Sequence, residues 1–223
     1  MNCMRFRNVL FLAAIFILIP VTVQADADRL LIDNFSQGSD EQGTPIGWEL
    51  KENEGIPYIA VTRYNHEHVL HLVSSKASFG ITKDIEVDVR EYPFINFRWK
   101  AVELPKGGDF RDKKTDDQAG QVYVVFGRFK LTAKIVGYLW ENKAPQFATG
   151  VSPAWGKTRL IVLQSGPENL GTWIWEKRNL YHDYQELFGK KPHKTNLISI
   201  FINSQHTNSR AECFYGEIYF SKK

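Results

Sequence analysis

Cysteine is almost absent from this chain, which has two cysteines among 223 residues. Cys3 lies near the N-terminus, ahead of the first apolar run, and Cys213 lies within the apolar run CFYGEIYF. Because Cys3 falls within a predicted leader, the mature chain keeps a single cysteine, which excludes an internal disulfide. We interpret Cys213 as a small buried side chain rather than as a nucleophile.

Long hydrophobic runs are missing except at the N-terminus. Residues 1–25 combine a basic start, the apolar run Val9–Ile19 and the sequence Val23-Gln24-Ala25, which fits a signal-peptidase site. The run is too short to span a bilayer comfortably, and Pro20 breaks it. The pattern predicts a cleavable signal peptide over residues 1–25 and a periplasmic or secreted protein of a Gram-negative bacterium, without a membrane span after cleavage. An uncleaved N-terminal anchor is the alternative.

A strong net charge is also missing. Removing residues 1–25 takes away Arg5 and Arg7 but no acid, so the formal net charge falls from +3 to +1. A nearly neutral chain lacks the strongly basic face that nucleic-acid binding requires, so no nucleic-acid partner is expected. No repeat, low-complexity tract or linker divides residues 26–223. These residues are enough for one domain with a substantial core, and we predict a single domain there.

Strand signals dominate the mature chain. Short runs rich in Val, Ile, Phe, Tyr and Trp are bounded by Gly, Pro, Asn and Asp. Eleven runs are expected as strands: Leu30–Phe35, Tyr58–Tyr64, Val69–Ser74, Phe79–Val89, Phe94–Val102, Gln121–Phe129, Ala133–Trp140, Thr158–Gln164, Thr172–Lys177, Leu197–Asn203 and Glu212–Phe220. Within Phe94–Val102, apolar residues from Ile95 to Ala101 alternate with polar ones, which suggests one buried face. We predict an all-β, two-sheet antiparallel sandwich resembling a jelly roll, with a closed barrel as the alternative.

One segment has helical rather than strand periodicity. In NLYHDYQELFG, residues 179–189, Leu180, Tyr184, Leu187 and Phe188 recur at helical spacing. Asn179 is suited to the N-cap and Gly189 to the C-cap. The sequence therefore predicts one short amphipathic helix packed against the sandwich.

The segment KTDDQAGQVYVVFG, residues 114–127, places Asp116 and Asp117 where a polar loop meets a predicted strand. We favour a structural role, in which Asp117 forms a buried ion pair with Arg98 or Arg178 and holds the loop. Ligand binding by Asp116 and Asp117 is the second hypothesis. A metal site is disfavoured because three cations interrupt the preceding acidic loop and its spacing fits no EF-hand. No metal and no other cofactor is expected.

A catalytic role for Asp116 or Asp117 would require a partner. Glycoside hydrolysis uses two carboxyl groups about 5–10 Å apart. The candidate partners are Glu141, Glu176 and Asp183. The sequence has no G-x-S-x-G elbow, H-E-x-x-H motif or phosphate-binding glycine loop. Enzyme activity is therefore the less favoured hypothesis.

Tryptophans offer another route to a ligand, since flat aromatic faces stack on sugars. Trp173 and Trp175 are two residues apart and would share one face of a strand, while Trp155 lies in the loop SPAWGKT. With Asp116 and Asp117, these three residues are the candidate ligand contacts. The alternative is that the six tryptophans of the chain fill the core between the sheets.

Several segments together resemble a known family. They are TPIGW (44–48), FRWKAVELPKGGD (97–109), KTDDQAGQVYVVF (114–126), YLWEN (138–142), LGTWIWEKRNLYHDYQELFG (170–189) and FYGEIYF (214–220). In this order they resemble the secreted bacterial family known as domain of unknown function 3047. The resemblance implies a single exported domain and no established activity.

The chain departs from that family at three positions. The family usually carries acids where this chain has Asn203 and Gln205, and often an arginine where it has Gln121. Any site of the family that needs those carboxylates would be weakened here.

These observations lead to three hypotheses about function. The favoured one is an exported, non-catalytic protein that binds a glycan or another ligand of the cell envelope. The alternatives are a polysaccharide-acting enzyme that uses a carboxylate pair and a periplasmic protein–protein scaffold. The sequence does not define the oligomeric state.

Overall fold

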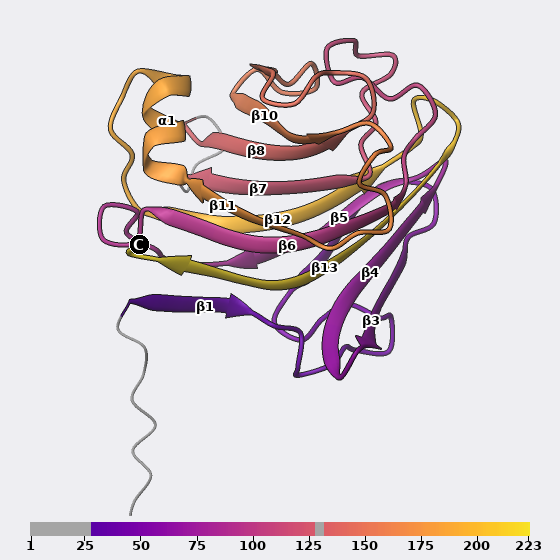
Figure 1. Ribbon diagram of the computed structural model, residues 1–223, viewed down its shortest axis with the longest axis horizontal. Helices are drawn as coiled ribbons and strands as arrows, with labels where there is room; N and C mark the ends of the chain where they lie inside the picture. The colour runs from indigo at the N-terminus through magenta and orange to yellow at the C-terminus, as the bar shows by residue number, and fades with distance from the viewer. Residues whose placement is uncertain (1–27, 128–131) are drawn as a thin grey trace, which may run out of the picture.

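A computed structural model describes residues 28–127 and 132–223 and shows a β-sandwich with one helix at its end (Figure 1). The predicted signal peptide, residues 1–25, lies outside the described residues. The six-stranded sheet contains β1 (Arg29–Asp33), β3 (Tyr58–Tyr64), β4 (Glu67–Ser75), β6 (Phe94–Glu103), β11 (Ile174–Asn179) and β13 (Arg210–Ser221). Its order is β11-β6-β13-β4-β3, with β1 paired to the end of β13 beyond β4.

The second sheet has seven strands in the order β2-β5-β12-β7-β8-β10-β9. Its strands are β2 (Glu49–Glu54), β5 (Ser78–Asp84), β7 (Gly120–Phe126), β8 (Lys134–Glu141), β9 (Thr149–Val151), β10 (Thr158–Ser165) and β12 (Thr195–Asn203). Neighbouring strands are antiparallel in both sheets except for β8 and β10, which are parallel. The predicted sandwich is confirmed, and this parallel pair is the departure from the antiparallel expectation.

The core lies between the two sheets and is built by strand alternation. In β6, Ile95, Phe97, Trp99 and Ala101 are fully buried, as their alternation predicted. Inward residues of β7, β12 and β13 pack against them in one continuous cluster. Cys213 is fully buried in this cluster, where burial raises the pKa of its thiol to about 12. Its interpretation as a small core residue is confirmed.

The predicted helix, α1 (Leu180–Phe188), begins and ends where its caps indicated. The backbone N–H of His182 donates to the Asn179 Oδ1 atom at 3.0 Å. Gly189 takes the left-handed conformation, with φ of 63°, that closes the last turn. Leu180 and Tyr184 are buried against the sheets. Among the described residues, no helix is long and apolar enough to cross a membrane.

Two strands were not predicted. The sequence of β2, ELKENE, is dominated by charged residues, and β2 lies at the edge of its sheet beside β5. Charged side chains suit an edge strand because they discourage pairing with other chains, but they hide the strand from patterns of apolar residues. The other strand, β9, has only three residues.

Candidate ligand-binding site

A groove runs along the outer face of the seven-stranded sheet, on the side away from the core. It consists of two adjoining hollows of about 1150 and 300 Å³. The side chains common to both hollows are Val125, Ile135, Trp155 and Leu197. All except Trp155 come from or directly beside strands, so the sheet itself forms the floor.

Two aromatic rings of this floor lie over glycines of neighbouring strands. Tyr123 stands opposite Gly137 on the neighbouring strand, and Phe201 stands opposite Gly80. A Cβ atom at position 137 would lie 2.5 Å from Tyr123 Cε1, and one at position 80 would lie 2.4 Å from Phe201 Cδ2. Each ring therefore occupies the space that a side chain of the adjacent strand would need, and the two glycines allow the rings to lie against the sheet.

Trp155 stands at the side of the groove on the turn before β10. The Trp155 backbone N–H donates to Ser152 Oγ at 3.4 Å, and its carbonyl accepts from the Thr158 N–H at 2.9 Å. These bonds fix the turn, and the indole is half-buried. Hydroxyl groups of Thr82, Ser152, Thr158 and Ser199 line the smaller hollow beside the rings. The groove thus combines flat apolar faces with hydrogen-bonding groups.

A buried polar cluster continues from Tyr123 toward the end of the sheet. The Tyr123 hydroxyl donates to Gln121 Oε1, and Gln121 Nε2 donates to Asn203 Oδ1 at 2.7 Å. Asn203 Oδ1 also accepts from the Gln118 backbone at 2.8 Å, while Asn203 Nδ2 donates to the Asp116 carbonyl at 2.5 Å. Gln118 Nε2 donates to Asp116 Oδ1 at 3.0 Å. The segments 114–127 and 202–210 therefore meet at one end of the sandwich, on the right of Figure 1.

This contact relates two departures from the expected family pattern. Positions 121 and 203 are joined directly by a hydrogen bond. Where the resemblance predicts charged side chains, this chain has two neutral amides that satisfy each other. The cluster is consequently held together without an ion pair between these two positions.

Asp117 is fully buried and holds the loop that follows β12. Its Oδ2 atom accepts from the Thr207 backbone N–H at 2.6 Å and from the Thr207 hydroxyl at 2.7 Å. Its Oδ1 atom accepts from the His206 backbone N–H at 3.3 Å. Asp117 therefore joins two loops that are about ninety residues apart in the sequence.

The predicted ion pair of Asp117 with Arg98 or Arg178 is wrong. Arg98 pairs with Glu67 on the outer face of the six-stranded sheet, and Arg178 pairs with Asp183 on α1. Backbone groups of the 206–207 turn, the Thr207 hydroxyl and the His206 ring, whose Nδ1 atom lies 3.2 Å from Asp117 Oδ1, take the place of a guanidinium at Asp117. The expectation that this acid holds a loop fits the contacts, but the partner differs.

Glu141, the first candidate for a catalytic partner, is fully buried and serves as an acceptor for backbone groups. Its carboxylate accepts from the N–H groups of Phe110 at 3.1 Å, Asn142 at 3.1 Å and Lys143 at 3.3 Å. Burial raises the pKa of Glu141, opposed in part by hydrogen bonds from Ala144, Gln118, Asn142 and Lys143. With no exposed surface, its carboxylate does not reach the groove.

Glu176 and Asp183, the other candidate partners, also have structural contacts. Glu176 Oε1 accepts from Trp99 Nε1 at 3.2 Å and from Gln164 Nε2 at 2.7 Å. Asp183 accepts from Tyr138 Oη at 2.8 Å and from Arg178 Nη2 at 2.6 Å, which ties α1 to the sandwich. Within residues 28–127 and 132–223, no group of three or more His, Cys, Asp and Glu side chains is arranged to hold a metal ion.

Comparison with known sequences gives one family match. The sequence model of the family described as Protein of unknown function (DUF3047) matches residues 47–219. The chain belongs to the DUF3047 family. The match runs from the residue before Trp48 into β13, so it contains the groove and the polar cluster. No curated protein matches the sequence.

Several solved structures are similar in overall architecture to this DUF3047 protein. A family 11 carbohydrate-binding module from Clostridium thermocellum has 9% identity and a TM-score of 0.47, over 88% of this chain and 97% of the module. A family 30 module of a cellulosomal cellulase from the same organism has 11% identity and a TM-score of 0.47, over 87% and 98%. The xyloglucanase domain of a type three effector from Sinorhizobium fredii has 10% identity and a TM-score of 0.45, over 79% and 93%.

The six tryptophans of this DUF3047 protein lie in three places. Trp48, Trp99 and Trp140 are buried in the core. Trp155 lies in the groove, whereas Trp175 is 54% exposed and lies with Trp173 on the six-stranded sheet. The structure therefore separates Trp173 and Trp175 from Trp155, although the sequence analysis grouped them as ligand contacts.

Tyr123 and Phe201 were missed as groove residues. Their outward direction could be read from alternation, because Tyr123 lies between the inward Val122 and Val124. Gly80 comes from a strand that is distant in the sequence from Phe201, and Gly137 lies opposite Tyr123 only through the register of the consecutive strands β7 and β8. No local pattern reveals these pairings.

Proposed function

We propose that this DUF3047 protein is exported through a cleavable leader at residues 1–25. We further propose that the mature chain, residues 26–223, is a single non-catalytic domain that binds a glycan of the Gram-negative cell envelope in the groove of the seven-stranded sheet. The observation that carries the proposal is the pair of rings, Tyr123 and Phe201, that lie over Gly137 and Gly80 beside Trp155.

The chemistry of the groove suits sugars. A pyranose ring presents apolar C–H faces, which pack on flat aromatic rings, and hydroxyls at its rim, which need hydrogen-bond partners. The floor supplies the rings of Tyr123 and Phe201, and the surrounding side chains of Thr82, Ser152 and Ser199 supply hydroxyl groups. An extended groove, rather than a closed cavity, suits a chain of several sugar units.

The non-catalytic part of the proposal is supported by the acids. Asp117 and Glu141 are fully buried, and each is saturated by hydrogen bonds that hold loops. Glu176 and Asp183 bind side chains of the core and of Arg178. A polysaccharide-cleaving enzyme needs two carboxyl groups that both reach the sugar, and these four are engaged in structural contacts.

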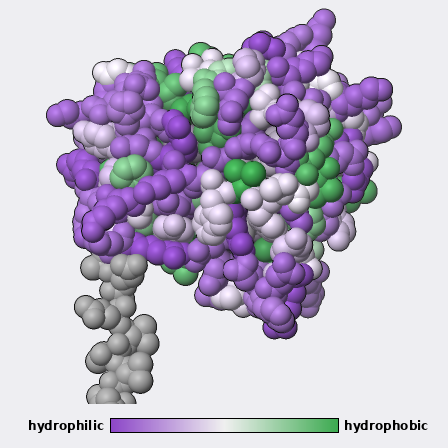
Figure 2. Space-filling view, viewed as in Figure 1, coloured by the Kyte–Doolittle hydropathy of each residue, from purple (hydrophilic) through white to green (hydrophobic). Residues whose placement is uncertain are grey.

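The scaffold alternative receives less support. A protein-docking surface of useful size is a large continuous apolar patch. On the face shown in Figure 2, hydrophilic side chains predominate and hydrophobic ones form small patches.

Binding is tested with protein purified after export and a panel of soluble cell-wall and exopolysaccharide fragments. Affinity electrophoresis should show retardation by at least one polysaccharide, and Trp155→Ala and Tyr123→Ala should weaken it. For uncharged polysaccharides, Trp175→Ala, which removes an exposed tryptophan of the other sheet, is the matched control and should leave retardation unchanged. Failure of every polysaccharide to retard the wild-type protein would contradict the proposal.

Export is tested separately. Cell fractionation should place the protein in the periplasm or the medium, and N-terminal sequencing should begin at Asp26. A membrane-bound product that retains residues 1–25 would contradict cleavage.

A further inference from the structure

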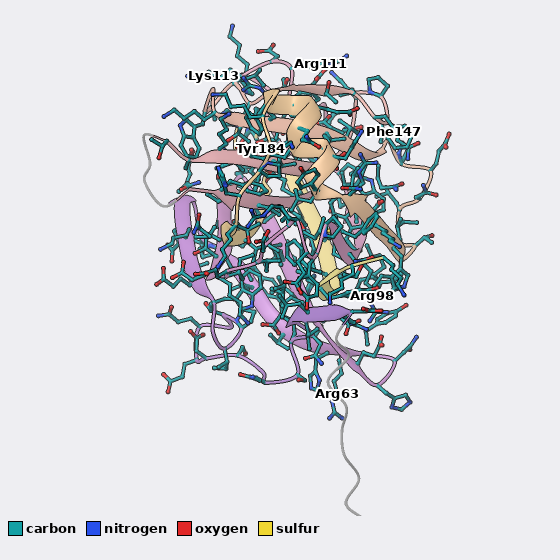
Figure 3. All side chains as sticks on the ribbon, turned by 90° about the vertical axis from the view of Figure 1, so that its left-hand side faces the viewer. Arg63, Arg98, Arg111, Lys113, Phe147 and Tyr184 are labelled. Atoms are coloured by element: carbon teal, nitrogen blue, oxygen red, sulfur yellow. The ribbon has the colours of Figure 1, made fainter. Side chains whose placement is uncertain are left out.

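A second hollow lies on the outer face of the six-stranded sheet and belongs to neither the groove nor the polar cluster. It has a volume of about 270 Å³ and is bounded by Arg98 of β6, Trp175 of β11 and Glu67 at the start of β4. In Figure 3, Arg98 lies at the right-hand surface of the molecule, well below Arg111 and Lys113 of the acidic loop. This hollow is therefore a separate location.

Arg98 is held in a fixed orientation within this hollow. It is the direct cross-strand neighbour of Trp175, and its guanidinium lies 4.9 Å from the ring centre of Trp173 and 5.5 Å from that of Trp175. A Cβ atom at Gly216 would lie 2.2 Å from Arg98 Nε, so only glycine at that position lets the arginine lie across β13. Arg98 Nε is buried and has no hydrogen-bond partner within the described chain.

Lys100 places a second cation beside Arg98, two residues along the same strand face. Its side chain is largely covered, with the residue 8% exposed, and its ammonium lies 4.2 Å from the ring centre of Tyr64 and 4.6 Å from that of Phe214. Trp173 contacts both cations, since it also lies 5.3 Å from the Lys100 ammonium. No carboxylate or other acceptor pairs with Lys100 in residues 28–127 and 132–223. A covered ammonium without an anion lacks its most favourable partner.

The acid in contact with Arg98 is easily displaced. Glu67 pairs with Arg98, but 57% of its side chain is exposed, and solvent-exposed ion pairs contribute little. Glu217, which also borders the hollow, is paired with Arg29. Only 14% of the Arg98 side chain is exposed, so the guanidinium needs an anion, whereas the more exposed Glu67 returns to water when it leaves. A ligand carboxylate could therefore replace Glu67 without leaving the covered charge of Arg98 unpaired.

We propose that this hollow binds a carboxylate-bearing sugar, such as a uronic acid residue of an acidic glycan. The carboxylate takes the place of Glu67 on Arg98, and charge-assisted hydrogen bonds of this kind are strong. Lys100 does not line the hollow, but its positive charge on the other side of the shared Trp173 contact also favours an anion there. The sugar ring packs on Trp175, which is 54% exposed and borders the hollow. This site is independent of the groove and does not rest on the function proposed for it.

The test compares trigalacturonate with its methyl ester, which has the same rings without the charge, by isothermal titration of the full mature chain. Trigalacturonate should bind, and the ester should bind at least about ten-fold more weakly. Trp175→Ala should weaken trigalacturonate binding to a similar degree. Equal affinity for the acid and the ester would overturn the proposal, as would displacement of the sugar by an equal concentration of sodium sulfate.

Glu67→Gln provides the sharpest variant, because the substitution is at an exposed position and removes the competitor of the ligand. It should strengthen trigalacturonate binding several-fold, whereas unchanged or weaker binding would overturn the assignment of Arg98. Lys177→Ala is the control: it removes a cation of β11 that lies over Phe94, outside the hollow, and should not change trigalacturonate binding. Trp155→Ala should also have no effect, so that failure of the groove and failure of this site are distinguishable.

Discussion

The ring of Tyr123 lies over Gly137 of the neighbouring strand, where a Cβ atom would come within 2.5 Å of Tyr123 Cε1. The same relationship recurs between Phe201 and Gly80. These two pairs place two aromatic rings on the floor of the groove, on the outer face of the seven-stranded sheet. The shape of the groove therefore depends on residues that contribute no side chain to it.

Gly137→Ala should lift the Tyr123 ring from the sheet. The added methyl group overpacks the site, so we expect a loss of about 1–3 kcal/mol in the free energy of unfolding and weaker glycan binding. Urea denaturation and affinity electrophoresis measure the two effects. Gly156→Ala is the stability control, because nothing lies within 4 Å of a Cβ at that position. Stability of Gly137→Ala equal to that of the control would contradict the close contact.

Asp117→Asn should destabilise the fold. In asparagine an NH2 group replaces one carboxylate oxygen. That group would face the donors of Thr207 or His206, so at least one buried hydrogen bond is lost. We expect a loss of about 1–3 kcal/mol in the free energy of unfolding at neutral pH, measured by chemical denaturation. A change below about 0.5 kcal/mol, typical of ordinary surface substitutions, would show that the loop is held by other contacts.

Asp116→Asn, at the adjacent position, should have the opposite effect and should depend on pH. Burial raises the pKa of Asp116, opposed in part by its bond from Gln118. A raised pKa in the folded state means that ionisation of Asp116 lowers the stability of the folded protein. That loss is absent below the unfolded aspartate pKa of about 3.9 and reaches its full size above the raised folded value.

The stabilities of wild type and Asp116→Asn should therefore diverge as pH rises. The asparagine keeps an oxygen for the Gln118 amide, which lies 3.0 Å from Asp116 Oδ1. Relative to wild type, the variant should gain stability as the pH rises above about 4, until the raised folded-state pKa of Asp116 is passed. Thermal unfolding at a series of pH values measures the difference. A difference that is constant with pH, or that shifts in favour of wild type, would contradict the assigned pKa direction.

Asp183→Asn should loosen the attachment of α1. The substitution leaves Arg178 without its carboxylate and weakens the contact with the Tyr138 hydroxyl. We expect a loss of about 2–4 kcal/mol in the free energy of unfolding. This is at the low end for a broken buried ion pair because 29% of the Arg178 side chain is exposed. Guanidinium denaturation measures it. His182→Ala, on the exposed side of the same helix, should change stability by less than about 0.5 kcal/mol.

Local patterns in the sequence were enough to predict most strands and the helix. Strand β3 has the predicted bounds, and α1 has both predicted caps, because apolar periodicity and capping residues act over a few positions. Strand β2 was not predicted because it lies at an edge of the sheet, where charged side chains are favoured and apolar residues do not alternate with polar ones.

The site was predictable only in part, because its contacts join distant segments. Trp155 was expected from its loop and does line the groove. The partner of Asp117, by contrast, is a backbone turn at 206–207, and the floor of the groove requires Gly80 and Gly137 from other strands. Such pairings depend on strand order and register, which no local residue pattern specifies.

The most direct test of the proposed function is the affinity of three proteins for one glycan. The uncharged polysaccharide fragment that binds wild type most tightly is titrated into wild type, Tyr123→Ala and Trp175→Ala. If the groove binds glycan, Tyr123→Ala loses at least about ten-fold in affinity and Trp175→Ala retains wild-type affinity. Unchanged affinity of Tyr123→Ala, with loss in Trp175→Ala, would contradict the proposal and move glycan binding to the opposite sheet.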